Sequence, residues 1–183
     1  MKKISYFLMV LALVVLIAPS LVWSEANPAG NPPVITNSFA VEKGYYGYVL
    51  KIYIEAEDPD GDMSKIAIQV DQLGYGYYPA DWTIIKGPNR KHLKGYLQWN
   101  TFSSRTSYLK EWTNIRLRLS VFDKAGNESN EVVFPFEFVS GGKGQHQYKL
   151  PAPFNSGDVR RLGYIHTDLF EPTQMGNGHD RNR

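Results

Sequence analysis

The strongest constraint on the fold is a period-two alternation of apolar and polar side chains in the middle of the chain. In residues 115–121, isoleucine, leucine and valine alternate strictly with arginine and serine. Successive side chains of a β-strand point to opposite faces, so this pattern is typical of a strand with one face in the core and one in water. We therefore expect Leu117 and Leu119 to be buried and Arg116 and Arg118 to be exposed.

Six further segments share this alternation or its β-branched and aromatic enrichment, and turn residues separate them. The predicted strands are residues 35–41, 49–57, 66–70, 82–85, 93–100, 115–121 and 134–138. No stretch has the period of a helix. Together the strands predict an all-β fold, namely a single seven-stranded immunoglobulin-like antiparallel sandwich over residues 34–139.

Residues 1–26 have the pattern of a cleaved secretory signal peptide. Two lysines precede an apolar run, and small residues then offer cleavage after Ser24 or after Ala26. The apolar run is shorter than the ~20 residues that a membrane-spanning helix needs. Residues 27–33 follow as a linker rich in proline, glycine and asparagine. We expect an exported chain, located in the periplasm, on the cell surface or outside the cell, with no membrane contact after cleavage.

Charge and cysteine content exclude several classes of function. The 183 residues contain 20 Lys+Arg and 18 Asp+Glu, a formal net charge of +2. A nearly neutral chain of this kind argues against nucleic acid as a partner. The chain has no cysteine, which excludes disulfides, iron–sulfur clusters, thiolate zinc sites and thiol catalysis.

Residues 140–183 differ from the rest and predict an extended, partly disordered C-terminal tail. A glycine-rich break opens the segment, its apolar residues follow neither period, and its prolines oppose a long helix. Residues 159–166 have the composition of a short strand. An extended segment can add to an exposed sheet edge, in its own domain or in a neighbour. We expect the tail to dock in this way and favour a neighbouring molecule.

Two motifs resemble those of bacterial extracytoplasmic domains. Residues 55–62, Glu-Ala-Glu-Asp-Pro-Asp-Gly-Asp, resemble the loop after the second strand of cadherin-like and PKD-like surface domains. Residues 121–130, Val-Phe-Asp-Lys-Ala-Gly-Asn-Glu-Ser-Asn, resemble the last hairpin of bacterial Ig-like and fibronectin-III-like modules. The resemblance implies an Ig-like module used for adhesion, spacing or ligand binding.

The same two motifs form a candidate calcium site. In an Ig-like sandwich their loops lie at one end, and they supply Asp58, Asp60, Asp62, Asp123 and Asn127. Calcium takes six to eight oxygen ligands, which carboxylates and amides provide. The alternative is that both segments are ordinary turns, whose aspartates bond their own loop amides. Calcium is the one cofactor that the sequence suggests.

The opposite end of the predicted sandwich is rich in aromatic residues and forms a candidate binding surface. Its loops supply Tyr45, Tyr46, Tyr75, Tyr77, Tyr78 and Tyr108. Such rings combine a large apolar area with a polar tip, which is typical of binding surfaces. The alternatives are packing against the tail or core, contact with a protein partner, and stacking on a glycan.

The sequence shows no hydrolase elbow, phosphate loop or dinucleotide motif. His166 and Asp168 could form an acid–base pair, but on an irregular tail we interpret them as a surface cluster. We therefore predict an exported, non-enzymatic binding or structural module of the cell envelope or surface, acting through protein–protein contacts of the aromatic loop end and the C-terminal tail, or through self-assembly. A carbohydrate-binding module is the alternative, and a small secreted enzyme is the third choice.

Overall fold

The structure is a computed structural model, and it describes residues 30–74, 76–102, 113–139, 148–157 and 159–169. The predicted signal peptide lies outside the described residues. Within the described part of the chain, no helix is long and apolar enough to cross a membrane.

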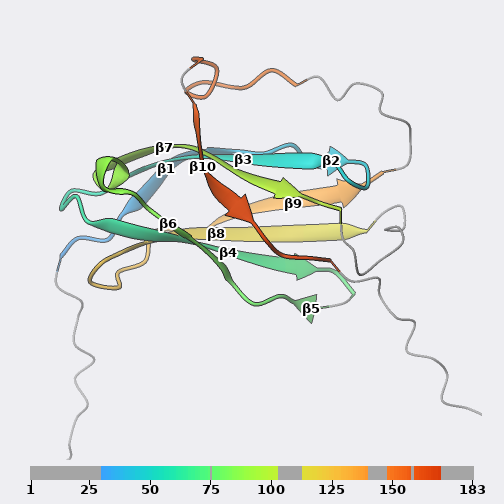
Figure 1. Cartoon of the computed structure of the whole chain (residues 1–183), viewed down its shortest axis with the longest axis horizontal. Coiled ribbons are helices and arrows are strands. Elements are labelled where there is room, and N and C mark those ends of the chain that lie inside the picture. Colours follow the sequence, from blue (N-terminus) through green and yellow to red (C-terminus); the bar gives the residue numbers. More distant parts are fainter. Residues whose placement is uncertain (1–29, 75, 103–112, 140–147, 158, 170–183) are drawn as a thin grey trace, which may run out of the picture.

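The described residues form an all-β sandwich of two sheets (Figure 1). One sheet has the strand order β1-β3-β7-β10, and the other has the order β2-β9-β8-β4-β5, with β6 also paired to β4. The strands are β1 (Val34–Phe39), β2 (Lys43–Gly44), β3 (Val49–Glu57), β4 (Met63–Gln72), β5 (Gly76–Tyr77), β6 (Asp81–Ile84), β7 (His92–Asn100), β8 (Asn114–Asp123), β9 (Val132–Phe138) and β10 (Arg160–Ile165). A single 3₁₀ turn, η1 (Gly87–Asn89), precedes β7.

The predicted β-sandwich is confirmed, and each of the seven predicted segments overlaps a strand. The prediction is wrong in two details: β2 and β5 are additional strands, and the pairs β10–β7 and β2–β9 are parallel. The strand β10 lies within residues 159–166, where the composition indicated a short strand. The fourth predicted strand, β6, pairs with β4 and so joins the sheet of β8 and β9. Two-residue strands are too short to show alternation, and long-range pairing leaves no local sequence signal.

The core lies between the two sheets, and the alternation assigns its side chains correctly. Leu117 and Leu119 of β8 are buried in the same cluster as Trp99. Arg116 and Arg118 keep 51% and 40% of their side chains exposed. The facing of β8 is thus the one that the period-two pattern predicts.

The tail packs over the outside of the β1-β3-β7 sheet. Tyr53 of β3 points away from the core, yet it is only 5% exposed. Phe154, 1% exposed, lies with its ring centroid 5.6 Å from that of Tyr53. Phe39 contacts both Tyr53 and Tyr148. These rings form a small second core, because the tail shields what is otherwise the solvent face of the sheet.

The tail then runs along the edge of the sandwich as β10, between β7 and β6 (Figure 1). It docks as extended chain, as expected, but on its own domain and not on a neighbour. Trp99 Nε1 donates a hydrogen bond to the carbonyl oxygen of Thr167 at 2.9 Å. A Cβ on Gly163 would lie 2.6 Å from Thr83 Cγ2, so glycine allows β10 this close to β6. The chain itself covers the open edge of β7.

Candidate functional site

The feature that stands out is an outer face, on the sheet opposite the tail, that no described segment of the chain covers. We use "outer face" for the core-averted side of β4, β5, β6, β8 and β9. Its most exposed apolar side chains are Ile84 (70%), Tyr77 (64%), Val133 (48%) and Trp82 (45%). Trp82 and Ile84 are two residues apart in β6, so both point outward while Thr83 between them is buried.

Aromatic and cationic side chains pack together at the β6 side of the outer face. The rings of Trp82 and Phe122 have centroids 5.6 Å apart and are inclined at 60°. Lys65 Nζ lies 4.3 Å from the Trp82 ring centroid and 5.5 Å from that of Phe122. An ammonium over an aromatic face is an attractive arrangement. These contacts hold Trp82 and Lys65 in place at the surface.

The remaining charges of the outer face occur as cross-strand pairs. Arg116 Nη1 lies 3.8 Å from Asp71 Oδ2, and Arg118 Nε donates to Glu131 Oε2 at 3.0 Å. The hydrogen bond to Glu131 raises the pKa of Arg118, which keeps its guanidinium charged. The outer face therefore combines exposed apolar groups with charges that largely neutralise each other.

The predicted acidic residues do meet at one end of the sandwich, where the β3–β4 and β8–β9 loops lie side by side (Figure 1). Two of their carboxylates hold their own loops. Asp58, which is buried, accepts hydrogen bonds from the backbone amides of Asp60 and Asp62. Asp123, also buried, accepts from the amide and the side-chain nitrogen of Asn127. These are the contacts expected if both segments are ordinary turns whose aspartates bond their own loop amides.

The other two aspartates of that end differ from each other. Asp60 accepts a hydrogen bond from the backbone amide of Asn31, at the end of the predicted linker. Asp62 Oδ1 is buried without a hydrogen-bond partner in the described structure. Burial and the nearby charge of Asp123 raise the pKa of Asp62. Among the described residues, no three acidic or histidine side chains are grouped so that they could hold a metal ion. Calcium binding at this end stays a prediction.

The predicted aromatic surface is divided by the structure. Tyr75 and Tyr108 lie outside the described residues. Tyr45 packs edge-on against Tyr48, and Tyr46 packs against Phe102, in both cases with centroids 5.5 Å apart. The side chain of Tyr78 is buried and donates to Gln72 Oε1 at 2.6 Å, so it belongs to the core and not to an exposed surface. Of the four predicted tyrosines that the structure describes, Tyr77 also lies on the outer face.

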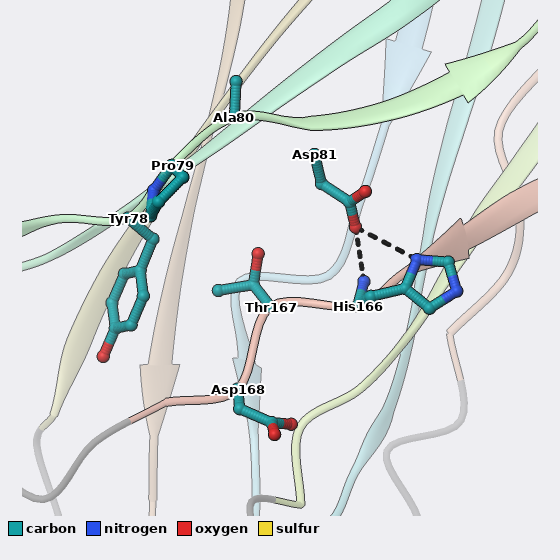
Figure 2. Close-up of a pocket in the computed structure, with 7 residues that line it drawn as sticks. All are labelled: Tyr78, Pro79, Ala80, Asp81, His166, Thr167 and Asp168. Carbon is teal, nitrogen blue, oxygen red and sulfur yellow. Dashed lines mark hydrogen bonds and ion pairs between the residues drawn. The ribbon is translucent and has the colours of Figure 1, made fainter.

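A pocket of about 310 Å³ forms where the segment after β10 meets the start of β6 (Figure 2). Its lining is Tyr78, Pro79, Ala80, Asp81, His166, Thr167 and Asp168. Asp81 Oδ2 accepts the backbone amide of His166 and lies 3.3 Å from His166 Nδ1. The sequence analysis interprets His166 and Asp168 as a surface cluster, and in the structure the ion-pair partner of His166 is Asp81. That contact fastens the end of the docked tail to β6.

The sequence predicts which side chains of β6 share a face, but it does not predict whether that face is exposed. Alternation in 81–84 places Trp82 and Ile84 on one side of a strand. It does not say which side the rest of the chain covers. The pairing of His166 with Asp81 has no signal in the sequence, because it joins segments that meet only through β10.

No protein-family model matches this sequence, and no curated protein matches it. Among solved structures, the PKD domain of an M14-like peptidase from Thermoplasmatales archaeon SCGC AB-540-F20 aligns with a TM-score of 0.38 and 16% sequence identity. The alignment covers 61% of this chain and 100% of that chain.

Proposed function

We propose that this protein is an exported, non-enzymatic binding or structural module of the cell envelope, and that it acts through protein–protein contacts on the outer face. The observation that supports the proposal is an asymmetry between the two sheets. The tail buries Tyr53 and its neighbours on one sheet, whereas Trp82, Ile84 and Tyr77 remain exposed on the other. Large apolar groups gathered on one face mark an interaction site more often than scattered ones do.

The composition of the outer face supports a protein as the partner. Protein interfaces are enriched in tryptophan, tyrosine and arginine, and their strongest contacts are often of these types. Trp82, Tyr77, Arg116 and Arg118 belong to that group and share one sheet face. Rigid strands hold them in place, so binding would require little ordering of the backbone.

The test is capture of a partner from native envelope extract by the immobilised chain without residues 1–26. Wild type is compared with the variant Ile84→Glu, which places a charge on the outer face. The matched control is Val34→Glu, since Val34 is 49% exposed on β1 of the other sheet. We expect Ile84→Glu to lose the captured protein and Val34→Glu to retain it. Capture that is equal for all three chains would refute the outer face as the binding surface.

Export is part of the proposal and is tested on the cell. The full chain is expressed in its host, and the mass of the product is measured. A product that begins after Ser24 or Ala26 supports export, and a cytoplasmic product that retains residues 1–26 refutes it.

Carbohydrate binding is the second candidate, and the exposed rings of Tyr77 and Trp82 favour it. The register places them beside Asp71 and Ala67 of β4, four residues apart, which corresponds to ~13 Å along the strand. Gln69 and Arg118 lie between them and offer hydrogen-bonding groups. A glycan array with wild type and Trp82→Ala separates the candidates, since Trp82-dependent glycan binding would support the carbohydrate module.

A further inference from the structure

We propose that the outer face binds the outer face of a second copy of this chain, with the two copies related by a two-fold axis. This inference rests on the proposed function and names the partner. It follows from the register of the strands, which arranges the side chains of the outer face in four rows across the sheet.

The first and last rows contain complementary groups. The first row holds Ile84 of β6, Lys65 of β4 and Phe122 of β8, which are register partners. The last row holds Tyr77 of β5, Asp71 of β4 and Arg116 of β8, which are register partners in turn.

The two rows between them combine the exposed apolar side chains of Trp82 and Val133 with small and polar groups. The second row contains Trp82, Ala67 and Ser120, and the third contains Gln69, Arg118 and Val133. Rows are two residues apart along each strand, or ~7 Å.

The proposed two-fold axis lies in the plane of the interface and is perpendicular to the strands. It passes between the second and third rows. It keeps each strand opposite its own copy and inverts the order of the rows. The first row then faces the last row of the partner. Ile84 lies opposite the ring of Tyr77, Lys65 opposite Asp71, and Phe122 opposite Arg116. The three contacts are apolar, ionic and cation–π, and each occurs twice in the dimer.

Among the described residues, Lys65 forms no ion pair within its own chain, and its contacts are with the Trp82 and Phe122 rings. In the dimer the carboxylate opposite Lys65 is that of Asp71, whose side chain is 9% exposed and lies 3.8 Å from Arg116 of its own chain, so Lys65 would meet the open side of an existing ion pair. Arg116 and Arg118 already have acidic neighbours in Asp71 and Glu131. Two of the three cations of the face are thus paired, which leaves little attraction for a strongly charged partner, whereas a second copy can place a carboxylate opposite the third.

The size of the outer face is consistent with a weak but specific dimer. Four adjacent strands at ~4.8 Å spacing are ~19 Å wide, and ten residues extend ~33 Å. The footprint is thus ~600 Å² on each copy, or ~1,200 Å² in total. Specific interfaces begin at about this area, and those at the lower limit are often transient.

The first experiment measures self-association by sedimentation velocity over a wide concentration range, using the chain without residues 1–26. We expect a monomer–dimer equilibrium that Ile84→Glu weakens at least ~10-fold and that Val34→Glu leaves unchanged. Monomer at every concentration would overturn the inference. Self-association that is equally strong in Ile84→Glu would overturn it as well.

The second experiment tests the row order and benefits from a chain without cysteine. The variants Ile84→Cys and Tyr77→Cys are mixed under mild oxidation, and the mixture of Val34→Cys with Tyr77→Cys is the control. We expect a mixed disulfide in the first mixture well above the control. Equal yields would overturn the proposed axis. An envelope protein captured through Ile84 by a chain that stays monomeric would overturn self-association and leave the proposed function standing.

Discussion

Docking of β10 against β6 can be tested by adding one methyl group. The perturbation is Gly163→Ala in β10. A Cβ at this position would lie 2.6 Å from Cγ2, 2.8 Å from Oγ1 and 3.3 Å from Cβ of Thr83 in β6. The first two distances are well inside van der Waals contact, so either Thr83 or β10 must move. The change therefore probes a contact between two segments that are far apart in the sequence.

The expected magnitude follows from these distances. Overpacking of a buried contact costs ~1–3 kcal/mol. Alanine in place of glycine within a strand recovers ~0.5–1 kcal/mol. In a Thr83→Ala background, the two closest atoms are gone and the nearest remaining atom is Cβ of residue 83, at 3.3 Å. There, Gly163→Ala should be neutral or stabilising, so the two substitutions should couple by ~1 kcal/mol or more.

Urea unfolding of wild type, both single variants and the double variant measures the coupling. The fluorescence of the buried Trp99 reports unfolding, and linear extrapolation gives the free energies. Gly157→Ala is the matched control in the tail, because a Cβ there has no atom within 4 Å. Effects that add within ~0.5 kcal/mol would show that Gly163 does not meet Thr83 in solution. That result would refute the docked position of β10.

Three further predictions concern the core and two ionisable groups. Leu119→Ala should lower the free energy of unfolding by ~2–5 kcal/mol, and Arg118→Ala, at an exposed ion pair, by far less; similar losses in urea melts would contradict the facing of β8. Burial, with the hydrogen bond to Tyr53, raises the pKa of Tyr148 to about 12, so the folded chain keeps a proton that the unfolded chain loses near pH ~10. Stability should then fall as pH rises from ~10 towards 12, and Tyr148→Phe should flatten that slope in alkaline urea melts, whereas an unchanged slope would count against the shift. Burial and the charge of Asp123 also raise the pKa of Asp62, so its ionisation costs stability as pH rises through the acid range. Asp62→Asn should therefore be more stable than wild type at neutral pH and should lose this advantage below pH ~4. Calcium binding should appear as a melting temperature that millimolar calcium raises in wild type but not in Asp62→Asn.

Local pattern was sufficient for the strands and for the direction of their side chains. A period of two is a property of each strand's own backbone, so Leu117 and Arg116 are assigned to opposite faces without knowledge of any other segment. Antiparallel pairing then brings alternate loops to the same end. This is why Asp62 and Asp123, from distant motifs, interact as the sequence predicts.

The sequence alone did not determine what covers each face. Tyr53 and Trp82 have equivalent signals, since each is an aromatic residue on the outward side of a predicted strand. Tyr53 is 5% exposed and Trp82 is 45% exposed, because Phe154 of the tail packs on the first and no described residue packs fully over the second. Alternation specifies the side of a strand and contains no information about distant segments.

The position of the tail also depended on the tertiary structure. Its apolar residues follow no period, since each of them meets a different surface. Phe154 packs on the outside of one sheet, and Ile165 enters the core between the two. The register of β10 is set by close approach at Gly163 and by the hydrogen bond from Trp99 to Thr167, both of which join residues far apart in the chain. Such contacts exist only once the sandwich has formed, so which face of the sandwich the tail covers was decided by the fold and not by local sequence.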